Sequence, residues 1–201
     1  MILLTCFFVG LFFSFIGSIP PGTINITTMQ YAMSNKKAVA ISFAAAAALT
    51  EYLYAGIAVK FQMYLTENTS FYSNFQIISG TVLIILGILN LVKQKLPNPK
   101  LELGEKRNAF KKGVLISLAN PLAIPFWLAV TVYLQGMNWI DLTGYNYFIY
   151  VAGISMGTFL LLALVTHLGA RFAFIQSNKF IVYRVPGMIF LLMGVYTFYN
   201  S

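Results

Sequence analysis

Polar and charged residues interrupt this sequence at only a few places, and the interruptions divide it into long apolar runs. A helix needs about 20 apolar residues to cross a bilayer. On that criterion the pattern predicts six membrane-spanning helices, at residues 2–33, 38–60, 72–92, 109–135, 145–169 and 179–199. We therefore expect an all-α integral membrane protein with a single transmembrane domain over residues 1–201.

Two of the predicted spans contain prolines that a regular helix cannot accommodate. Pro20-Pro21-Gly22 interrupts the first span, and Asn120-Pro121 interrupts the fourth. Proline lacks an N–H donor and clashes with the preceding turn, so it breaks or kinks a helix. Backbone groups freed at membrane depth cannot be satisfied by lipid, so such breaks occur where protein or a polar cavity surrounds them. We therefore expect both breaks to border an internal site.

The composition supports a membrane protein and limits its chemistry. Apolar residues make up 59% of the chain and charged residues 9%, whereas a soluble domain carries roughly 25% charged residues. The mean hydropathy is +0.77. The single cysteine, Cys6, excludes an internal disulfide and any cysteine-based metal cluster, and we expect it to be an inert lipid-facing or packing residue.

Basic residues gather in alternate loops and predict the orientation. They lie at Lys36-Lys37, across the segment from Lys93 to Lys112, and from Arg171 to Arg184. By the positive-inside rule these three loops are cytoplasmic and both termini face outward. Topology thus accounts for the net charge of +8, and we expect no nucleic-acid partner.

The second half of the sequence repeats the first at an offset of about 100 to 107 residues. The third span contains Gly80 and Gly87, the sixth contains Gly187 and Gly194, and the first and fourth spans are the broken ones. Because each half has three spans, the halves must have opposite orientations. We expect inverted repeats at 1–92 and 109–201, joined by a cytoplasmic loop at 93–108. Inverted repeats with interrupted helices indicate a secondary transporter whose site lies near the midplane.

Glu51 is the only acidic residue within a predicted span. It and Pro21 both lie roughly 20 Å from the first cytoplasmic turn, at 1.5 Å per residue, and hence at similar depth. Ionisable residues inside a membrane usually face a cavity and act in substrate or proton pathways. A protonated Glu51 with a purely structural hydrogen bond is the alternative.

The breaks also predict half-helices that begin within the membrane. Asparagine is a favourable N-cap and proline suits the first helical position, so one half-helix should begin at Pro121 after Asn120. Another should begin around Pro21-Gly22. Helix N-termini carry partial positive charge and free N–H groups, so the two ends would accommodate a carboxylate. Hydrogen-bonding side chains on the first half-helix extend this candidate substrate site to Thr23, Asn25 and Thr28.

Three stretches resemble the LysE-type amino-acid exporters, and together the likeness runs over essentially the whole chain. Pro21-Gly22-Thr23-Ile24-Asn25 is similar to their Pro-Gly-Pro-containing motif, with Thr23 in place of the second proline. Residues 45–54 resemble their small-residue helix with an acid, here Glu51 rather than Asp. Residues 110–121 resemble their Gly…Asn-Pro motif, which continues here with Leu122 where lysine is common.

The resemblance implies a homodimeric export carrier of the bacterial inner membrane, driven by an ion gradient. We expect a proton-coupled exporter of amino acids or similar zwitterionic solutes, with the carboxylate at the half-helix starts. Glu51 would face the ammonium group or exchange a proton. An alternative is a divalent metal or cation efflux protein, although Glu51, His167 and Cys6 make a poor ligand set. Hydrolase and protease motifs do not occur, so we expect neither an enzyme nor a bound cofactor or metal.

Overall fold

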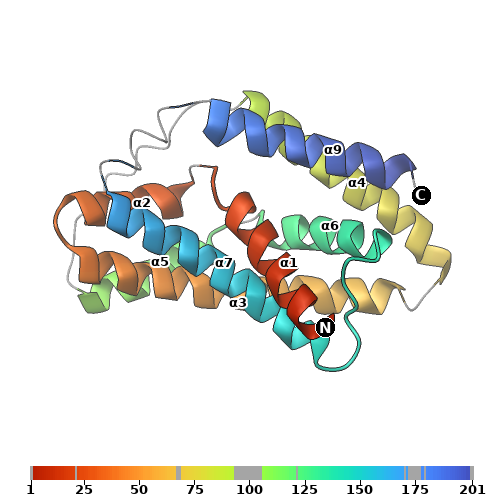
Figure 1. Ribbon diagram of the computed structural model, residues 1–201, viewed down its shortest axis with the longest axis horizontal. Helices are drawn as coiled ribbons and strands as arrows, with labels where there is room; N and C mark the ends of the chain where they lie inside the picture. The colour runs from red at the N-terminus through yellow and green to blue at the C-terminus, as the bar shows by residue number, and fades with distance from the viewer. Residues whose placement is uncertain are drawn as a thin grey trace.

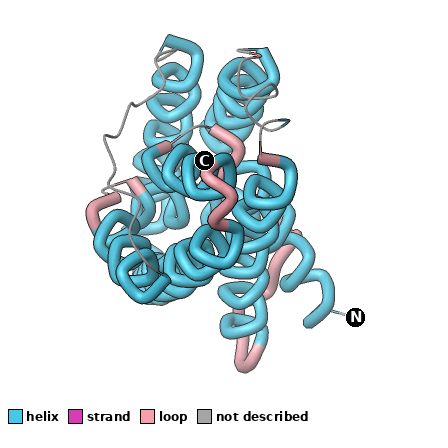
Figure 2. The backbone as a smooth tube through the Cα atoms, turned by 90° about the vertical axis from the view of Figure 1, so that its left-hand side faces the viewer, coloured by secondary structure: helices cyan, strands magenta, loops and turns pink. Residues whose placement is uncertain are grey.

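The computed structural model describes residues 2–20, 22–66, 69–92, 106–120, 122–169, 171, 178 and 180–199. Pro21, Pro121 and most of the predicted cytoplasmic loop 93–108 lie outside the described residues. All regular structure in the described part is helical (Figure 2), which confirms the predicted all-α class.

The helices follow the apolar runs of the sequence (Figure 1). In chain order they are α1 (Ile2–Gly17), α2 (Thr23–Met33), α3 (Lys37–Thr66), α4 (Thr69–Val92), α5 (Lys106–Leu118), α6 (Ala123–Gly136), α7 (Asn146–Leu168), a π-helix η1 (Phe180–Arg184) and α9 (Val185–Tyr199). Each predicted span coincides with one helix or with two helices in series. The first span is divided between α1 and α2, and the fourth between α5 and α6, which are bent by 64°.

Several helices have the length and composition of membrane spans. Within the described residues, α3 and α7 are long and apolar enough to cross a membrane, and the bent α5–α6 pair is a third candidate. Helices α1 and α9 and residues 76–92 of α4 are shorter apolar helices. Large apolar side chains such as Leu53, Ile57 and Leu192 are exposed, as lipid-facing residues are. The full count of six spans stays a prediction.

Glycines allow a close contact between α4 and α9, which lie side by side (Figure 1). A Cβ atom on Gly80 would lie 3.2 Å from the carbonyl oxygen of Gly194, and one on Gly87 would lie 2.9 Å from that of Gly187. The reverse distances, from Gly194 to Gly80 and from Gly187 to Gly87, are 2.9 Å and 3.1 Å. Small residues allow membrane helices to approach this closely. The pairing is reciprocal, and the two helices run antiparallel.

Two further glycines make matching contacts between the halves. A Cβ atom on Gly10 of α1 would lie 2.5 Å from the carbonyl oxygen of Tyr150 of α7. One on Gly113 of α5 would lie 2.8 Å from the carbonyl oxygen of Phe43 of α3. The first half-helix of each broken span therefore packs against the helix that follows the other broken span.

Helix α6 lies in the interior of the bundle. It packs against α3 on one side and against α4 on the other. Its side chains Trp127, Val130 and Leu134 are fully buried and join Val59 of α3 and Leu83 of α4 in the largest apolar cluster. The break that precedes α6 is thereby placed among other helices.

Candidate functional site

The Glu51 carboxylate lies on the face of α3 that packs against α6. It is half-buried, and its Oε1 atom accepts a hydrogen bond from the indole Nε1–H of Trp127. Trp127 is itself 1% exposed. This bond uses one of the two carboxylate oxygens and ties α3 to the second half of the broken fourth span.

Tyr54 lies one turn beyond Glu51 and ties α3 to the first half of the same span. Its hydroxyl donates a hydrogen bond of 2.6 Å to the carbonyl oxygen of Leu118, the last residue of α5. The last carbonyls of a helix have no partner within that helix, so this bond satisfies an orphaned acceptor. Helix α3 thus holds both edges of the break.

The second half-helix begins two residues later than the sequence indicates. Helix α6 begins at Ala123, its N-cap residue is Leu122, and no side chain caps it. The side chain of Asn120 instead accepts a hydrogen bond of 3.2 Å from the N–H of Leu122. Asparagine commonly bonds to the backbone two residues on, so it forms a turn here and not a helix cap.

At the first break, α2 begins at Thr23 with Gly22 as its uncapped N-cap residue. Asn25 is buried, and its amide donates to the carbonyl oxygens of Ser18 at 2.6 Å and Pro20 at 3.1 Å. It therefore satisfies carbonyls freed at the end of α1. Thr28 is also buried and donates to the carbonyl oxygen of Ile24 at 2.9 Å. The partners of Asn25 and Thr28 are thus local backbone groups, whereas Gly22 and Thr23 are exposed.

The two breaks lie close together. A Cβ atom on Gly17, the last residue of α1, would lie 2.6 Å from Cζ of Phe126 in the first turn of α6. Near the start of α2, Ile24 packs against a small apolar cluster that Ala44 and Ala47 of α3 form with Leu162 of α7. In the described part of the chain Glu51 is bonded to Trp127 and not to Asn25 or Thr28, so the predicted residues do not form one hydrogen-bonded set.

Residues 15–201 match the LysE type translocator family. The chain belongs to this family. The resemblance drawn from the three stretches is confirmed. No curated protein and no solved structure matches the chain. As a LysE type translocator, the protein is a multi-pass membrane protein that exports small solutes, and its family comprises transporters and not enzymes.

Two residues that hold the candidate site together, Trp127 and Tyr54, were not found from the sequence. Trp127 had a usable signal, because tryptophan prefers the ends of membrane helices and Trp127 lies inside a predicted span. The signal for Tyr54 was weaker: it lies one turn after Glu51, the only acidic residue within a predicted span. A second polar contact was also missed, between Ser14 of α1 and Thr158 of α7, whose hydroxyl oxygens are 2.9 Å apart.

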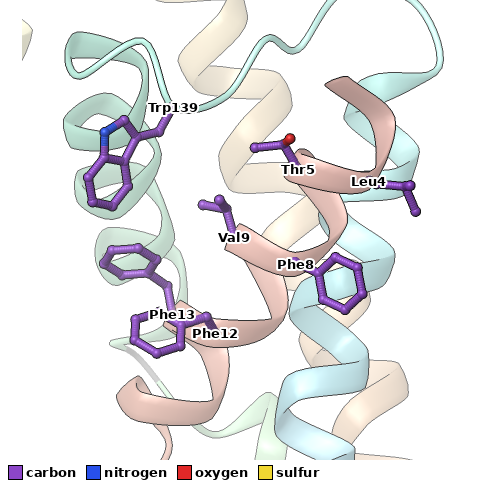
Figure 3. A pocket seen from close by; sticks show the side chains of 7 residues that line it. All are labelled: Leu4, Thr5, Phe8, Val9, Phe12, Phe13 and Trp139. Atoms are coloured by element: carbon purple, nitrogen blue, oxygen red, sulfur yellow. The ribbon is translucent and has the colours of Figure 1, made fainter. Parts of the chain in front are cut away.

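The translocator has an apolar groove of about 460 Å³ outside this polar region (Figure 3). Its lining residues are Leu4, Thr5, Phe8, Val9, Phe12, Phe13 and Trp139. In Figure 3 the rings of Phe13 and Trp139 lie on the same side of α1, with their centroids 6.2 Å apart. None of the predicted site residues lines the groove.

Other candidate metal ligands lie apart from Glu51. The Cys6 thiol contacts the carbonyl oxygen of Asp141 at 3.4 Å, and the exposed His167 ring lies 2.8 Å from the carbonyl oxygen of Ala163. Across the described residues no three His, Cys, Asp or Glu side chains come together as a metal site would require.

Proposed function

We propose that this translocator is a secondary-active exporter of amino acids or similar small zwitterionic solutes across the bacterial inner membrane, coupled to protons. The observation that carries the proposal is the Glu51 carboxylate, held by Trp127 beside a broken helix in the interior of the bundle. A carboxylate is costly at membrane depth, and its usual function there is to bind a cationic group or a proton.

The two edges of the fourth-span break suit the two ends of a zwitterion. Helix α5 ends at Leu118 and presents partial negative charge, whereas α6 begins at Ala123 and presents partial positive charge. A solute carboxylate is favoured at the first N–H groups of α6, and an ammonium group is favoured near the end of α5. Glu51 contacts α6 from α3, so it adds the negative charge that an ammonium group needs. Gly22, Thr23 and the start of α2 would complete the carboxylate side.

Glu51 can also provide the coupling. Its ionised carboxylate pairs either with the solute ammonium group or with a proton, but not with both. Solute leaving on the outside is then replaced by a proton, and the protonated carrier returns inward without uncompensated charge. This competition drives export from the inward proton gradient.

The proposed carrier has two inverted repeats, residues 1–92 and 109–201. The reciprocal contacts of Gly80 with Gly194 and of Gly87 with Gly187 support it, because an antiparallel pair related by a two-fold axis makes each contact twice. The matching contacts of Gly10 and Gly113 support it too. In this proposal both termini face outward. The carrier is also a homodimer, and this point rests on the family resemblance alone.

The test is efflux of a mixed labelled amino-acid pool from cells with and without the protein. Glu51→Gln keeps the size of the side chain and removes its charge, so we expect normal membrane insertion and no coupled export. Asp141→Asn is the matched control, because Asp141 is exposed and bonded to Thr143 within its own loop. Normal export by Glu51→Gln would remove Glu51 from the mechanism. Protection against divalent metal, without amino-acid efflux, would favour a metal exporter instead.

A further inference from the structure

Ser117, on the last turn of α5, has a buried hydroxyl that bonds to nothing in the described part of the protein. The residue is 2% exposed and its Oγ atom has no hydrogen-bond partner. Elsewhere in the bundle, buried hydroxyls use the carbonyl four residues earlier, as Thr27, Thr28 and Thr50 do. An unpaired hydroxyl in an apolar environment is unfavourable, so Ser117 requires a reason for remaining unpaired.

The packing of α5 on α3 places Ser117 at the level of Glu51. Gly113 of α5 lies against Ala46 of α3, since a Cβ atom there would lie 2.8 Å from the Ala46 Cβ. Further along both helices, Leu118 of α5 accepts the hydrogen bond of Tyr54. The helices therefore run in the same direction. On α5, Ser117 lies between the contact residues Gly113 and Leu118. On α3, Glu51 lies between the contact residues Ala46 and Tyr54. Ser117 is also one turn after Gly113, on the same helix face.

The other half of the molecule shows which pair this geometry brings together. Gly10 contacts the Tyr150 carbonyl just as Gly113 contacts that of Phe43. One turn after Gly10, the Ser14 hydroxyl lies 2.9 Å from that of Thr158. Ser117 follows Gly113 by four residues, as Ser14 follows Gly10. Glu51 follows Phe43 by eight residues, as Thr158 follows Tyr150. The counterpart of the Ser14–Thr158 pair is therefore Ser117 with Glu51.

The two pairs differ in chemistry and in how they are satisfied. Ser14 and Thr158 bond to each other, and both are buried. The Oε1 atom of Glu51 instead accepts from Trp127, and the Ser117 hydroxyl has no hydrogen-bond partner among the described residues. One half thus closes its helix contact with a neutral pair. The other half keeps an acceptor oxygen of a carboxylate and an acceptor hydroxyl on neighbouring helices.

We propose that Ser117 and Glu51 together bind the ammonium group of the exported solute, with the Ser117 hydroxyl accepting one of its hydrogen bonds. An ammonium group has three N–H donors and no acceptor, so it needs several acceptors around one point. Glu51 supplies a charged one, Ser117 a neutral one, and the carbonyl end of α5 adds partial negative charge. The inference rests on the proposed function and deepens it, because it names Ser117 as a ligand of the solute.

The experiment compares Ser117→Ala with Ser14→Ala in the full-length protein reconstituted into liposomes. The solute is the amino acid that the wild type exports fastest from a labelled pool. Ser117→Ala should raise its KM about tenfold, with Vmax within about twofold, because one hydrogen bond to a charged group is lost. Its thermal midpoint should stay the same or rise, since an unpaired hydroxyl is removed. Ser14→Ala should lower the midpoint by a few degrees and leave KM unchanged.

A des-amino analogue of that amino acid, used as an inhibitor, reports which end of the solute Ser117 binds. Its inhibition constant should be the same for the wild type and Ser117→Ala, because the analogue has no ammonium group. An unchanged amino-acid KM in Ser117→Ala, whatever its thermal midpoint, would overturn the role of Ser117 while the proposed function stands. A wild type that moves no amino acid from the pool would overturn the proposed function and this inference with it.

Discussion

Replacing Gly113 with alanine tests the close approach of α3 and α5 on which the site geometry depends. The new Cβ would lie 2.8 Å from both the Ala46 Cβ and the Phe43 carbonyl oxygen. Because real Cβ contacts rarely fall below 3.4 Å, the helices must separate by the difference, about 0.6 Å. The Phe43 atom belongs to the backbone, so a change of side-chain rotamer cannot relieve this clash.

The separation should affect stability and transport together. Overpacking of a close contact lowers the folding stability by about 1–3 kcal/mol. The better helix propensity of alanine offsets at most ~1 kcal/mol of that loss. We expect the thermal midpoint of the purified protein to fall by several degrees. The 2.6 Å bond from Tyr54 to Leu118 would be stretched, and export should fall at least tenfold, since displacements below 1 Å at a binding site are costly.

Gly136→Ala is the matched control, because the nearest atom to its new Cβ, in the Gln76 side chain, is 4.0 Å away. That variant should be as stable as the wild type or slightly more stable, with unchanged export. Both variants are compared by thermal unfolding in one detergent and by efflux at equal abundance. If Gly113→Ala matches Gly136→Ala in both assays, the helices do not approach as described and the alignment of Ser117 with Glu51 loses its support.

Two further substitutions test the bonds that hold the break. Trp127→Phe keeps a ring but removes the donor to Glu51, so efflux at low solute concentration should fall about tenfold, as expected for a hydrogen bond to a charged group. Wild-type efflux at equal abundance would show that the bond has no part in transport. Tyr54→Phe leaves the Leu118 carbonyl without its donor and should destabilise the protein by about 1 kcal/mol. The corresponding fall in thermal midpoint is about 2–4 °C, and an unchanged midpoint would argue against this cap.

Features that depend on local sequence were predictable. Apolar length placed the helical segments, and prolines placed the two breaks, because both effects act within a few residues. Glu51 was identifiable because a lone acid within a membrane-embedded helix needs a partner whatever the surrounding fold. The spacing of Gly80, Gly87, Gly187 and Gly194 indicated related helices, and these residues form the α4–α9 contact.

Features that depend on helix rotation were not predictable. Trp127 meets Glu51 because of the way α6 packs against α3, which a single sequence does not encode locally. Asn25 was predicted as a ligand because it is polar and near a break, and that role stays a prediction. The break itself frees the carbonyls of Ser18 and Pro20, and the Asn25 amide satisfies them. Likewise Asn120 bonds to Leu122 within its own turn, so α6 begins later than predicted.

The central claim is that the Glu51 carboxylate couples solute movement to protons. Its most direct test is amino-acid transport into liposomes containing either the wild type or Glu51→Gln, with a pH gradient imposed and then abolished. We predict transport against a concentration gradient by the wild type only while the pH gradient is present, and none by Glu51→Gln. Equal gradient-driven transport by the two proteins would contradict the claim.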